Sequence, residues 1–368
     1  MSNSDFEAAR LTVRLGAIAE NYRICQRLAA PAEVTGVVKA DAYGMGMEAC
    51  ARALAAAGCD TFFVARLEEG IALRPIVPGS RIFVLDGAQP DMVPALIEYR
   101  LTPALNSLAE IAAWSAAARE MRTALDAAIH IDTGMNRLGL PGNELATLAA
   151  EAGRRLDGLR VVLWMSHLAC ADDPADRMNV VQLDRFRTAL AMLPPAPASL
   201  ASSGGILLGK DYTFDMVRPG LGLYGGRPQS QRPNPFKTVA QLCGRILQIR
   251  RVDVGESAGY GATFRTGRPS TLATVALGYA DGLMRALSNR GHGAIGGQRA
   301  PIAGRVSMDL ITLDVTDIPP RAVELGAEVE FLGDTIALDE LAAASGTAPY
   351  EILTSFKPRV RRHYVSGL

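Results

Sequence analysis

An alternation of short apolar runs with longer amphipathic segments constrains the fold of this chain more than any other feature. Between residues 33 and 224, runs rich in β-branched side chains alternate with helix-like segments such as residues 47–57, which Gly58 closes. Parallel sheets built from βα units have this pattern. The predicted strands are residues 34–38, 62–65, 82–85, 102–105, 127–131, 160–165, 199–201 and 214–217. Eight parallel strands predict an α/β fold with a closed (β/α)8 barrel of the TIM type.

A proline-rich stretch at residues 227–235 ends this alternation, because its three prolines fit neither a helix interior nor a central strand. Beyond it, apolar runs are separated by Gly and Asp turns, with little helix until residues 339–344. The candidate strands there are residues 245–252, 271–277, 311–315 and 329–332. We expect residues 15–230 to form the barrel and residues 231–368 a mostly β domain. An early strand near residues 11–15 suggests that residues 1–14 pack with that second domain.

The charge balance argues against a polyanionic partner, since 38 basic residues match 38 acidic residues. The first ten residues contain no basic segment followed by an apolar stretch. No later run approaches the roughly 18 apolar residues that a membrane-spanning helix requires. We therefore expect a cytoplasmic protein that binds neither nucleic acid nor membrane.

Cysteines and histidines indicate neither a disulfide framework nor a metal site. The 5 cysteines are scattered and form no C-x-x-C pair, so we interpret them as core thiols. The four histidines lie far apart without the spacing of metal ligands; they are His130, His167, His292 and His363. No metal is expected.

The residues that directly follow the predicted strands carry candidate chemistry. Function in a barrel lies at the C-terminal ends of the strands, and phosphate often binds after strands seven and eight. The candidates are Lys39 after the first strand, Arg137 after the fifth, His167 after the sixth, the Ser-Ser-Gly-Gly turn at residues 202–205 after the seventh, and Arg218 after the eighth. A desolvated lysine favours the neutral amine that forms Schiff bases, and a glycine-rich turn at a helix start can bind phosphate. Each residue alone has an ordinary structural explanation, but their combination on one rim predicts an active site.

Two competing motifs fail on their context. Residues 220–225 match G-x-G-x-x-G, yet Pro228 follows within three residues and no acidic residue appears before Asp253, so we reject a dinucleotide fold. The segment around Ser202 and Ser203 lacks the G-x-S-x-G pattern of a hydrolase nucleophile.

The segment Val-Lys-Ala-Asp-Ala-Tyr-Gly at residues 38–44 resembles the cofactor-lysine signature of alanine racemases. Further similar segments follow in the family's order; they are residues 132–139, 166–167, 218–220, 224–225, 259–261, 278–282 and 304–309. The resemblance covers nearly the whole chain. It implies an isomerase dependent on pyridoxal 5'-phosphate, which interconverts L-alanine and D-alanine and supplies D-alanine as a peptidoglycan precursor. It also implies a homodimer whose active sites use residues of both subunits.

By this resemblance, Lys39 and Tyr260 are the catalytic pair. Lys39 carries the cofactor and acts as the base on the D face of the substrate, while Tyr260 of the partner subunit is the base on the L face. Arg218 faces the pyridine nitrogen, and Arg137 with the Met308 backbone N–H orients the substrate carboxylate. The cofactor-binding set that the resemblance implies is Lys39, Tyr43, His167, Ser203, Arg218, Gly220 and Tyr350. The residues similar to those of the family's access channel are Asp172, Tyr279, Arg285 and Arg305.

Several positions depart from the family pattern. His130 stands where many members have a lysine, carbamylated in some, that holds the substrate-binding arginine, so the support of Arg137 must differ here. Ser202 replaces a usual asparagine, and Gly204 a variety of small residues. The other departures are Gly205, Ser307 and Leu310. These departures leave substrate breadth and cofactor affinity open.

The alternatives share the cofactor lysine. A broad-specificity or serine racemase of the same family stays open, as does a biosynthetic or a catabolic role. A barrel-type decarboxylase would need a characteristic cysteine in the second domain, and Cys243 lies far from any matching motif. A non-catalytic cofactor-binding barrel would lack the second domain that carries Tyr260.

Overall fold

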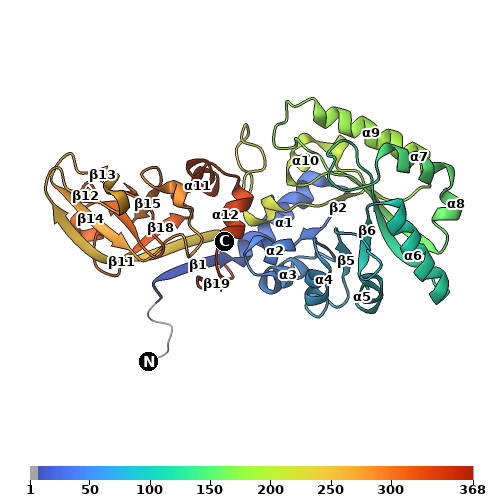
Figure 1. Cartoon of the computed structure of the whole chain (residues 1–368), viewed down its shortest axis with the longest axis horizontal. Helices are drawn as coiled ribbons and strands as arrows, with labels where there is room; N and C mark the ends of the chain where they lie inside the picture. Colours follow the sequence, from blue (N-terminus) through green and yellow to red (C-terminus); the bar gives the residue numbers. More distant parts are fainter. Residues whose placement is uncertain (1–6, 368) are drawn as a thin grey trace.

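The computed structural model describes residues 7–367, which form a barrel and a mostly β part at opposite ends of the molecule (Figure 1). The barrel contains a seven-stranded parallel sheet in chain order. Its strands are β3 (Gly36–Val37), β4 (Thr61–Val64), β5 (Arg81–Val84), β6 (Thr102–Leu105), β7 (Leu125–His130), β8 (Leu159–Met165) and β9 (Ala198–Ser199). They coincide within two residues with the runs expected from the sequence.

An additional strand pair joins the edges of this sheet. Strand β2 (Glu33–Val34) pairs in parallel with β10 (Met216–Val217). The N–H of Thr35 then donates to the carbonyl of Val217 at 3.1 Å, while the N–H of Arg218 donates to the carbonyl of Ala201 at 2.9 Å. Both edges are thereby linked through β10, and the expected α/β barrel is confirmed.

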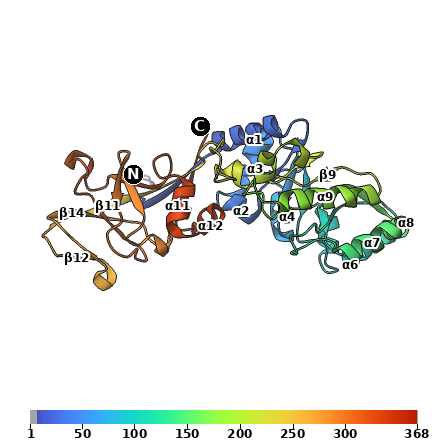
Figure 2. The ribbon, with the colours of Figure 1, turned by 90° about the horizontal axis from the view of Figure 1, so that it is seen from above.

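Helices cover the outside of the barrel (Figures 1 and 2). They are α1 (Leu15–Ala29), α3 (Met47–Ala56), α4 (Leu67–Leu73), α5 (Val93–Glu98), α6 (Leu108–Met121), α7 (Gly142–Ala150), α8 (Ala152–Arg155), α9 (Met178–Met192) and α10 (Ser203–Leu208). In α1, the buried residues Ile18, Tyr22, Cys25 and Ala29 recur at helical spacing and form one apolar face. Burial of such faces against the strands places the strand ends around one rim.

The second part contains an eight-stranded sheet organised around the long strand β11. Its strands are β1 (Ala9–Arg14), β11 (Ala240–Val252), β14 (Ser270–Val275), β15 (His292–Ile295), β16 (Gln298–Pro301), β17 (Ile311–Asp314), β18 (Glu328–Leu332) and β19 (Arg361–Val365). Strand β1 pairs antiparallel with β11 and parallel with β19. The early strand of the sequence thus lies in this sheet, while residues 1–6 lie outside the described residues. The exact domain boundaries stay a prediction.

Two helices of the C-terminal region lie near the junction of the two parts (Figure 1). Helix α11 (Leu338–Ser345) matches the helix expected at residues 339–344. Helix α12 (Pro349–Ser355) packs against α2 (Lys39–Tyr43), since a Cβ on Gly44 would lie 2.4 Å from the carbonyl oxygen of Leu353. The C-terminal region therefore contributes one wall at the mouth of the barrel. No helix within residues 7–367 combines the length and apolarity that a membrane crossing requires.

Candidate active site

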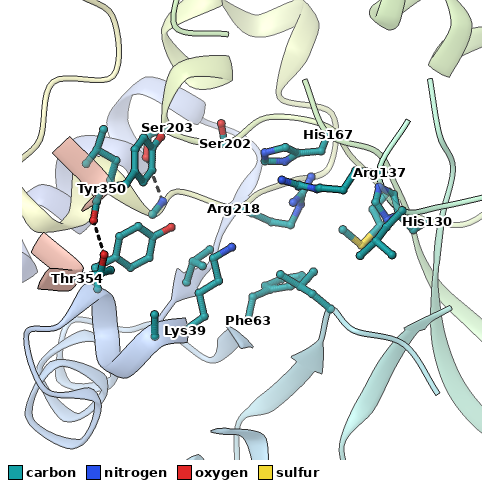
Figure 3. Close-up of a pocket in the computed structure, with 18 of the residues that line it drawn as sticks. Lys39, Phe63, His130, Arg137, His167, Ser202, Ser203, Arg218, Tyr350 and Thr354 are labelled. Carbon is teal, nitrogen blue, oxygen red and sulfur yellow. Dashed lines mark hydrogen bonds between the residues drawn. The ribbon is translucent and has the colours of Figure 1, made fainter. Parts of the chain in front are cut away.

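A cavity of about 590 Å³ opens at the C-terminal ends of the barrel strands, a size typical of small-molecule sites. The predicted site residues that line it are Lys39, Tyr43, Arg137, His167, Ser203, Arg218, Gly220 and Tyr350. In Figure 3, Lys39 extends into the cavity below Arg218 and His167. Tyr350 and Ser203 lie on one side of it, and His130 and Arg137 on the other. The structure thus brings together side chains as far apart in the sequence as Lys39 and Tyr350.

A left-handed turn follows Lys39 directly. Ala40, Asp41, Ala42 and Tyr43 have φ between 53° and 55°, which costs an L-residue roughly 1–2 kcal/mol each. The surrounding hydrogen bonds hold this conformation, since a carboxylate oxygen of Glu69 accepts the Ala40 N–H at 2.6 Å and Asp41 accepts the Met47 N–H at 2.7 Å. Strained backbone of this kind persists where surrounding contacts over-determine it, typically at functional sites.

The environment of Lys39 favours its neutral amine. Burial lowers the pKa of Lys39, and the nearby guanidinium groups of Arg137 and Arg218 lower it further. Glu69 and Asp86 oppose this shift. A neutral amine is the nucleophile that condenses with a carbonyl group.

Arg218 is a buried cation without an ionic partner among residues 7–367. Its Nε donates to Ser199 Oγ at 3.0 Å, and its Nη2 donates to the carbonyl oxygens of Leu200, at 3.3 Å, and of Ser166. Burial lowers the pKa of Arg218 to about 10, so the guanidinium stays charged at neutral pH. A charged hydrogen-bond donor that faces a cavity and has no carboxylate partner can donate to an acceptor atom of a bound molecule.

The protonation of His130 follows from its neighbour Asn106. Asn106 Nδ2 donates to the carbonyls of Leu85 and Ala104, at 3.1 and 2.9 Å, so its Oδ1 faces His130 Nδ1 at 2.9 Å as an acceptor. The hydrogen of the imidazole therefore lies on Nδ1. Burial and the Arg218 charge lower the pKa of His130 to about 4. Position 130 supplies a neutral imidazole in this chain, and no negative charge.

His167 is also held neutral at physiological pH. Burial lowers the pKa of His167 well below its ordinary value, and the charges of Arg218 and Arg137 add to this effect. The rim after the sixth strand thus presents a neutral imidazole beside two guanidinium groups.

Several neutral hydroxyl and backbone N–H groups lie near the start of α10. Ser203 Oγ accepts the N–H groups of Gly220 and Gly222, both at 3.0 Å, which joins α10 to the turn after β10. A Cβ on Gly220 would lie 2.1 Å from Tyr43 Oη, so only glycine admits the hydroxyl. Burial raises the pKa of Tyr43 and of Tyr350, which keeps both hydroxyls protonated. Hydroxyl and backbone donors at a helix start suit a phosphate group.

Two predicted site residues lie outside the cavity. Tyr260 is in the turn η3 (Tyr260–Ala262) between β12 (Ser257–Ala258) and β13 (Phe264–Arg265). Its side chain is 71% exposed, and that of Met308 is 53% exposed. Strand β12 lies far from α2 in both views of the chain (Figures 1 and 2). Neither residue contributes to the cavity of its own chain. The expected access-channel residues Asp172, Tyr279, Arg285 and Arg305 do not line it either.

The sequence did not indicate which apolar residues line the cavity. They are Val37, Phe63, Leu85, Leu138, Met165 and Leu221. The Arg218 Cζ lies 6.0 Å from the centre of the Phe63 ring, at the limit of a cation–π contact. Strand residues of this type are normal in any barrel core, so their location in the site became evident only from the structure. Within residues 7–367, no group of three or more His, Cys, Asp or Glu side chains is placed to hold a metal ion.

Comparison with known proteins identifies the family. The model of the "Alanine racemase, N-terminal domain" matches residues 13–228, and that of the "Alanine racemase, C-terminal domain" matches residues 239–364. A relative from Agrobacterium fabrum named "Alanine racemase, catabolic" is 46% identical over 97% of this chain and 92% of its own length. Another from the same organism, "Alanine racemase, biosynthetic", is 42% identical over 98% and 95% of the two chains.

Solved structures agree with these matches. The crystal structure of alanine racemase from Bartonella henselae with covalently bound pyridoxal phosphate has a TM-score of 0.94 and 39% identity, covering 98% of this chain and 100% of its own. The biosynthetic alanine racemase from Pseudomonas aeruginosa has a TM-score of 0.92 and 34% identity, covering 98% and 100%. On the evidence of both family models, these relatives and these structures, the chain belongs to the alanine racemase family.

Proposed function

We propose that this protein is an isomerase that interconverts L-alanine and D-alanine with pyridoxal 5'-phosphate, using Lys39 and Tyr260 as two bases. One observation carries the proposal, namely the cavity in which Lys39 extends toward the buried guanidinium of Arg218, which has no ionic partner among residues 7–367 (Figure 3). Family membership supplies the reaction class, because every relative and structure named above is an alanine racemase.

The residues of the cavity fit pyridoxal phosphate. Lys39 has the lowered pKa that covalent attachment to an aldehyde requires. The hydroxyls of Ser203, Tyr43 and Tyr350 would bind the phosphate beside Gly220, whose N–H donates to Ser203 Oγ. Arg218 would donate to the ring nitrogen. When bound, pyridoxal phosphate withdraws electrons from the α-carbon of an amino acid and so acidifies its hydrogen.

The proposed mechanism assigns one proton-transfer group to each face of the substrate. Lys39 Nζ takes or returns the α-proton on the D face, and Tyr260 Oη of the partner subunit does so on the L face. The Arg137 guanidinium and the partner subunit's Met308 N–H bind the substrate carboxylate and orient the α-carbon between the two bases. Arg218 donates a hydrogen bond without releasing its proton. Arg218 would therefore leave the ring nitrogen of a bound cofactor unprotonated, which would disfavour transamination.

A shared active site requires a homodimer. The exposed side chains of Tyr260 and Met308 support this part of the proposal, because neither residue lines the cavity of its own chain. A two-fold pairing would bring the barrel of one subunit to the β part of the other. A cytoplasmic location and a role in supplying D-alanine for peptidoglycan stay predictions.

Chiral chromatography of reactions started from single enantiomers tests the proposed activity. The protein should convert L-alanine and D-alanine each to an equal mixture. Serine and larger amino acids should be turned over more slowly. Comparable turnover across the panel would instead support a broad-specificity racemase, and no alanine turnover would overturn the proposal.

Reduction with borohydride should attach the pyridoxyl group to Lys39. The expectation rests on the lowered pKa of this lysine and its position in the cavity. Purified protein should be yellow before reduction, and peptide mapping should locate the adduct on the peptide that contains Lys39. An adduct at Lys210, Lys237 or Lys357 would contradict the assignment.

Gly220→Ala should weaken cofactor binding by roughly five- to 150-fold, because an overpacked contact costs roughly 1–3 kcal/mol. The added Cβ would lie 2.1 Å from Tyr43 Oη and displace this hydroxyl from the phosphate site. Equilibrium dialysis against free pyridoxal phosphate measures the effect. Gly142→Ala is the control, since no atom lies within 4 Å of a Cβ there. Equal affinities of the two variants would exclude Tyr43 and Gly220 from the phosphate site.

A further inference from the structure

Helix α9 presents a polar face to the two loops that carry Arg137 and His167. Asn179, Gln182 and Arg185 recur at intervals of three residues, so they share one side of the helix. Asn179 Nδ2 donates to the carbonyls of Cys170 and Asp173, at 3.1 and 2.8 Å, in the loop after β8. Arg185 Nη1 donates to the carbonyl of Thr133 at 3.0 Å in the loop after β7.

Gln182 is the residue of this face that joins both loops. Its side chain is fully buried. Oε1 accepts the Ala169 N–H at 2.8 Å, and Nε2 donates to the His167 carbonyl at 2.9 Å and to Thr133 Oγ1 at 3.1 Å. The backbone groups of Ala169 and His167 fix which end of the amide carries the oxygen. Gln182 thus uses both of its donors and its acceptor between the loops.

The same network continues to Arg218. Thr133 Oγ1 accepts from Gln182 Nε2 and also shares a hydrogen bond of 2.8 Å with Ser166 Oγ, in which either hydroxyl can donate. The carbonyl of Ser166 accepts a hydrogen bond from Arg218 Nη2. Both hydroxyl-bearing residues are almost completely buried. One connected set of hydrogen bonds therefore relates His167, Arg218 and the loop after β7, and buried networks of this kind tend to specify a single geometry.

The loop after β7 is an internally hydrogen-bonded turn. Asp132 Oδ1 accepts the N–H groups of Gly134, Met135 and Asn136 at 2.9, 2.9 and 3.1 Å. Arg137, which follows, is exposed and forms no ion pair among residues 7–367. The position of its guanidinium consequently depends on the position of this turn. Helix α9 contacts the turn at Thr133, through hydrogen bonds from Gln182 and Arg185.

We propose that Gln182 is a positioning residue that sets the spacing between Arg137 and His167, and thereby the affinity of the site for the carboxylate of the substrate. The inference rests on the proposed function, in which Arg137 binds that carboxylate. Gln182 touches neither substrate nor cofactor, and acts through Thr133 and the His167 backbone. A leucine at position 182 would leave the Ala169 N–H and the His167 carbonyl without partners.

Kinetics of Gln182→Leu and Thr133→Val test the proposal with the holoenzyme. Each variant should raise KM for alanine by roughly tenfold while kcat changes less, because a displaced Arg137 weakens substrate binding in both ground and transition states. The double variant should raise KM no further than the more impaired of the two single variants. The reason is that both changes interrupt the same chain of hydrogen bonds. Thr133→Ser keeps the hydroxyl and should restore the KM of the unmodified protein.

Thr61→Val is the matched control for Thr133→Val. Thr61 is fully buried, and its Oγ1 accepts from a side chain, Arg81 Nε, at 3.1 Å. It begins β4 and therefore lies at the end of the barrel opposite the cavity. This variant should lower the melting temperature as Thr133→Val does, yet leave KM unchanged. An equal KM for both threonine variants, together with an unchanged KM for Gln182→Leu, would overturn the proposal.

Hydrogen exchange followed by mass spectrometry gives a measurement that does not depend on the substrate. Gln182→Leu should accelerate exchange together in residues 132–137 and 167–173. Unchanged exchange in either segment would exclude the coupling, whatever the activity. If the unmodified protein racemises alanine and Arg137→Ala raises KM while Gln182→Leu does not, the positioning role fails and the proposed function stands. If the unmodified protein does not racemise alanine, the proposed function fails, and faster exchange in both segments still supports the coupling.

Discussion

Tyr260→Phe should slow the removal of the α-proton from L-alanine by about a thousandfold, within the range attributed to general bases, and that from D-alanine far less. The phenol is the proposed base on the L face, while Lys39 serves the D face. Since the Tyr260 side chain is 71% exposed in the single chain, loss of its hydroxyl removes no buried hydrogen bond of this subunit. The fold should therefore be retained.

The backbone of the turn around Tyr260 is tightly constrained. Gly259 and Gly261 on either side have φ of 73° and 71°, a conformation that few other residues adopt without strain. A Cβ on Gly261 would lie 3.1 Å from Arg305 Nη1, so the Arg305 guanidinium packs directly on this turn. An exposed aromatic side chain on such a constrained turn is suited to enter the cavity of another subunit.

Hydrogen exchange at the α-carbon separates the two bases, whereas turnover does not. Enantiomers are equally stable in water, so kcat/KM must fall equally in both directions for any variant. In deuterated water, Tyr260→Phe should still exchange the α-hydrogen of D-alanine with retention, through Lys39. Exchange from L-alanine should be nearly abolished. Tyr99→Phe, on the outside of the barrel after α5, should change neither rate. Equal losses from both enantiomers would indicate a structural role for Tyr260.

The barrel was predictable because its signal is local. Each strand from β3 to β9 is a short apolar run followed by helical structure, and with β10 these strands make up the eight of a closed barrel. The site followed from the same regularity, since parallel strand ends converge on one rim. The same regularity therefore predicts Lys39, His167 and Arg218 on one rim, and all three line the cavity.

Features that depend on distant residues were not predictable. The left-handed turn at residues 40–43 contains no glycine, and its conformation is fixed by Glu69 and Met47 from other segments. Helix α12 is only 7 residues long and carries Tyr350, a residue that only the family resemblance had indicated. The hydrogen bond from Gln182 to Thr133 connects residues that are 49 positions apart in the sequence. Patterns of apolar residues carry no information on such hydrogen bonds.

Mixing inactive Lys39→Ala with inactive Tyr260→Phe protein should restore activity, and this tests the shared site directly. Lys39 begins α2 in the barrel. Tyr260 lies between β12 and β13, at the opposite end of the molecule (Figures 1 and 2). If each site combines Lys39 of one subunit with Tyr260 of the partner subunit, a mixed dimer has one site with both lesions and one with neither. Random exchange makes about half of the dimers mixed, so recovery should approach roughly a quarter of the unmodified activity, by the symmetry of an isologous pair.

The matched control replaces one partner with the double variant Lys39→Ala/Tyr260→Phe. Mixed with Lys39→Ala, it gives dimers in which neither site has a lysine. Mixed with Tyr260→Phe, it gives dimers in which neither site has the tyrosine. Neither mixture should gain activity, although subunits exchange to the same extent, as native mass spectrometry can verify. If exchange is verified and the first mixture also stays inactive, Tyr260 does not complete the site of a partner subunit. The 71% exposure of its side chain would then require another explanation.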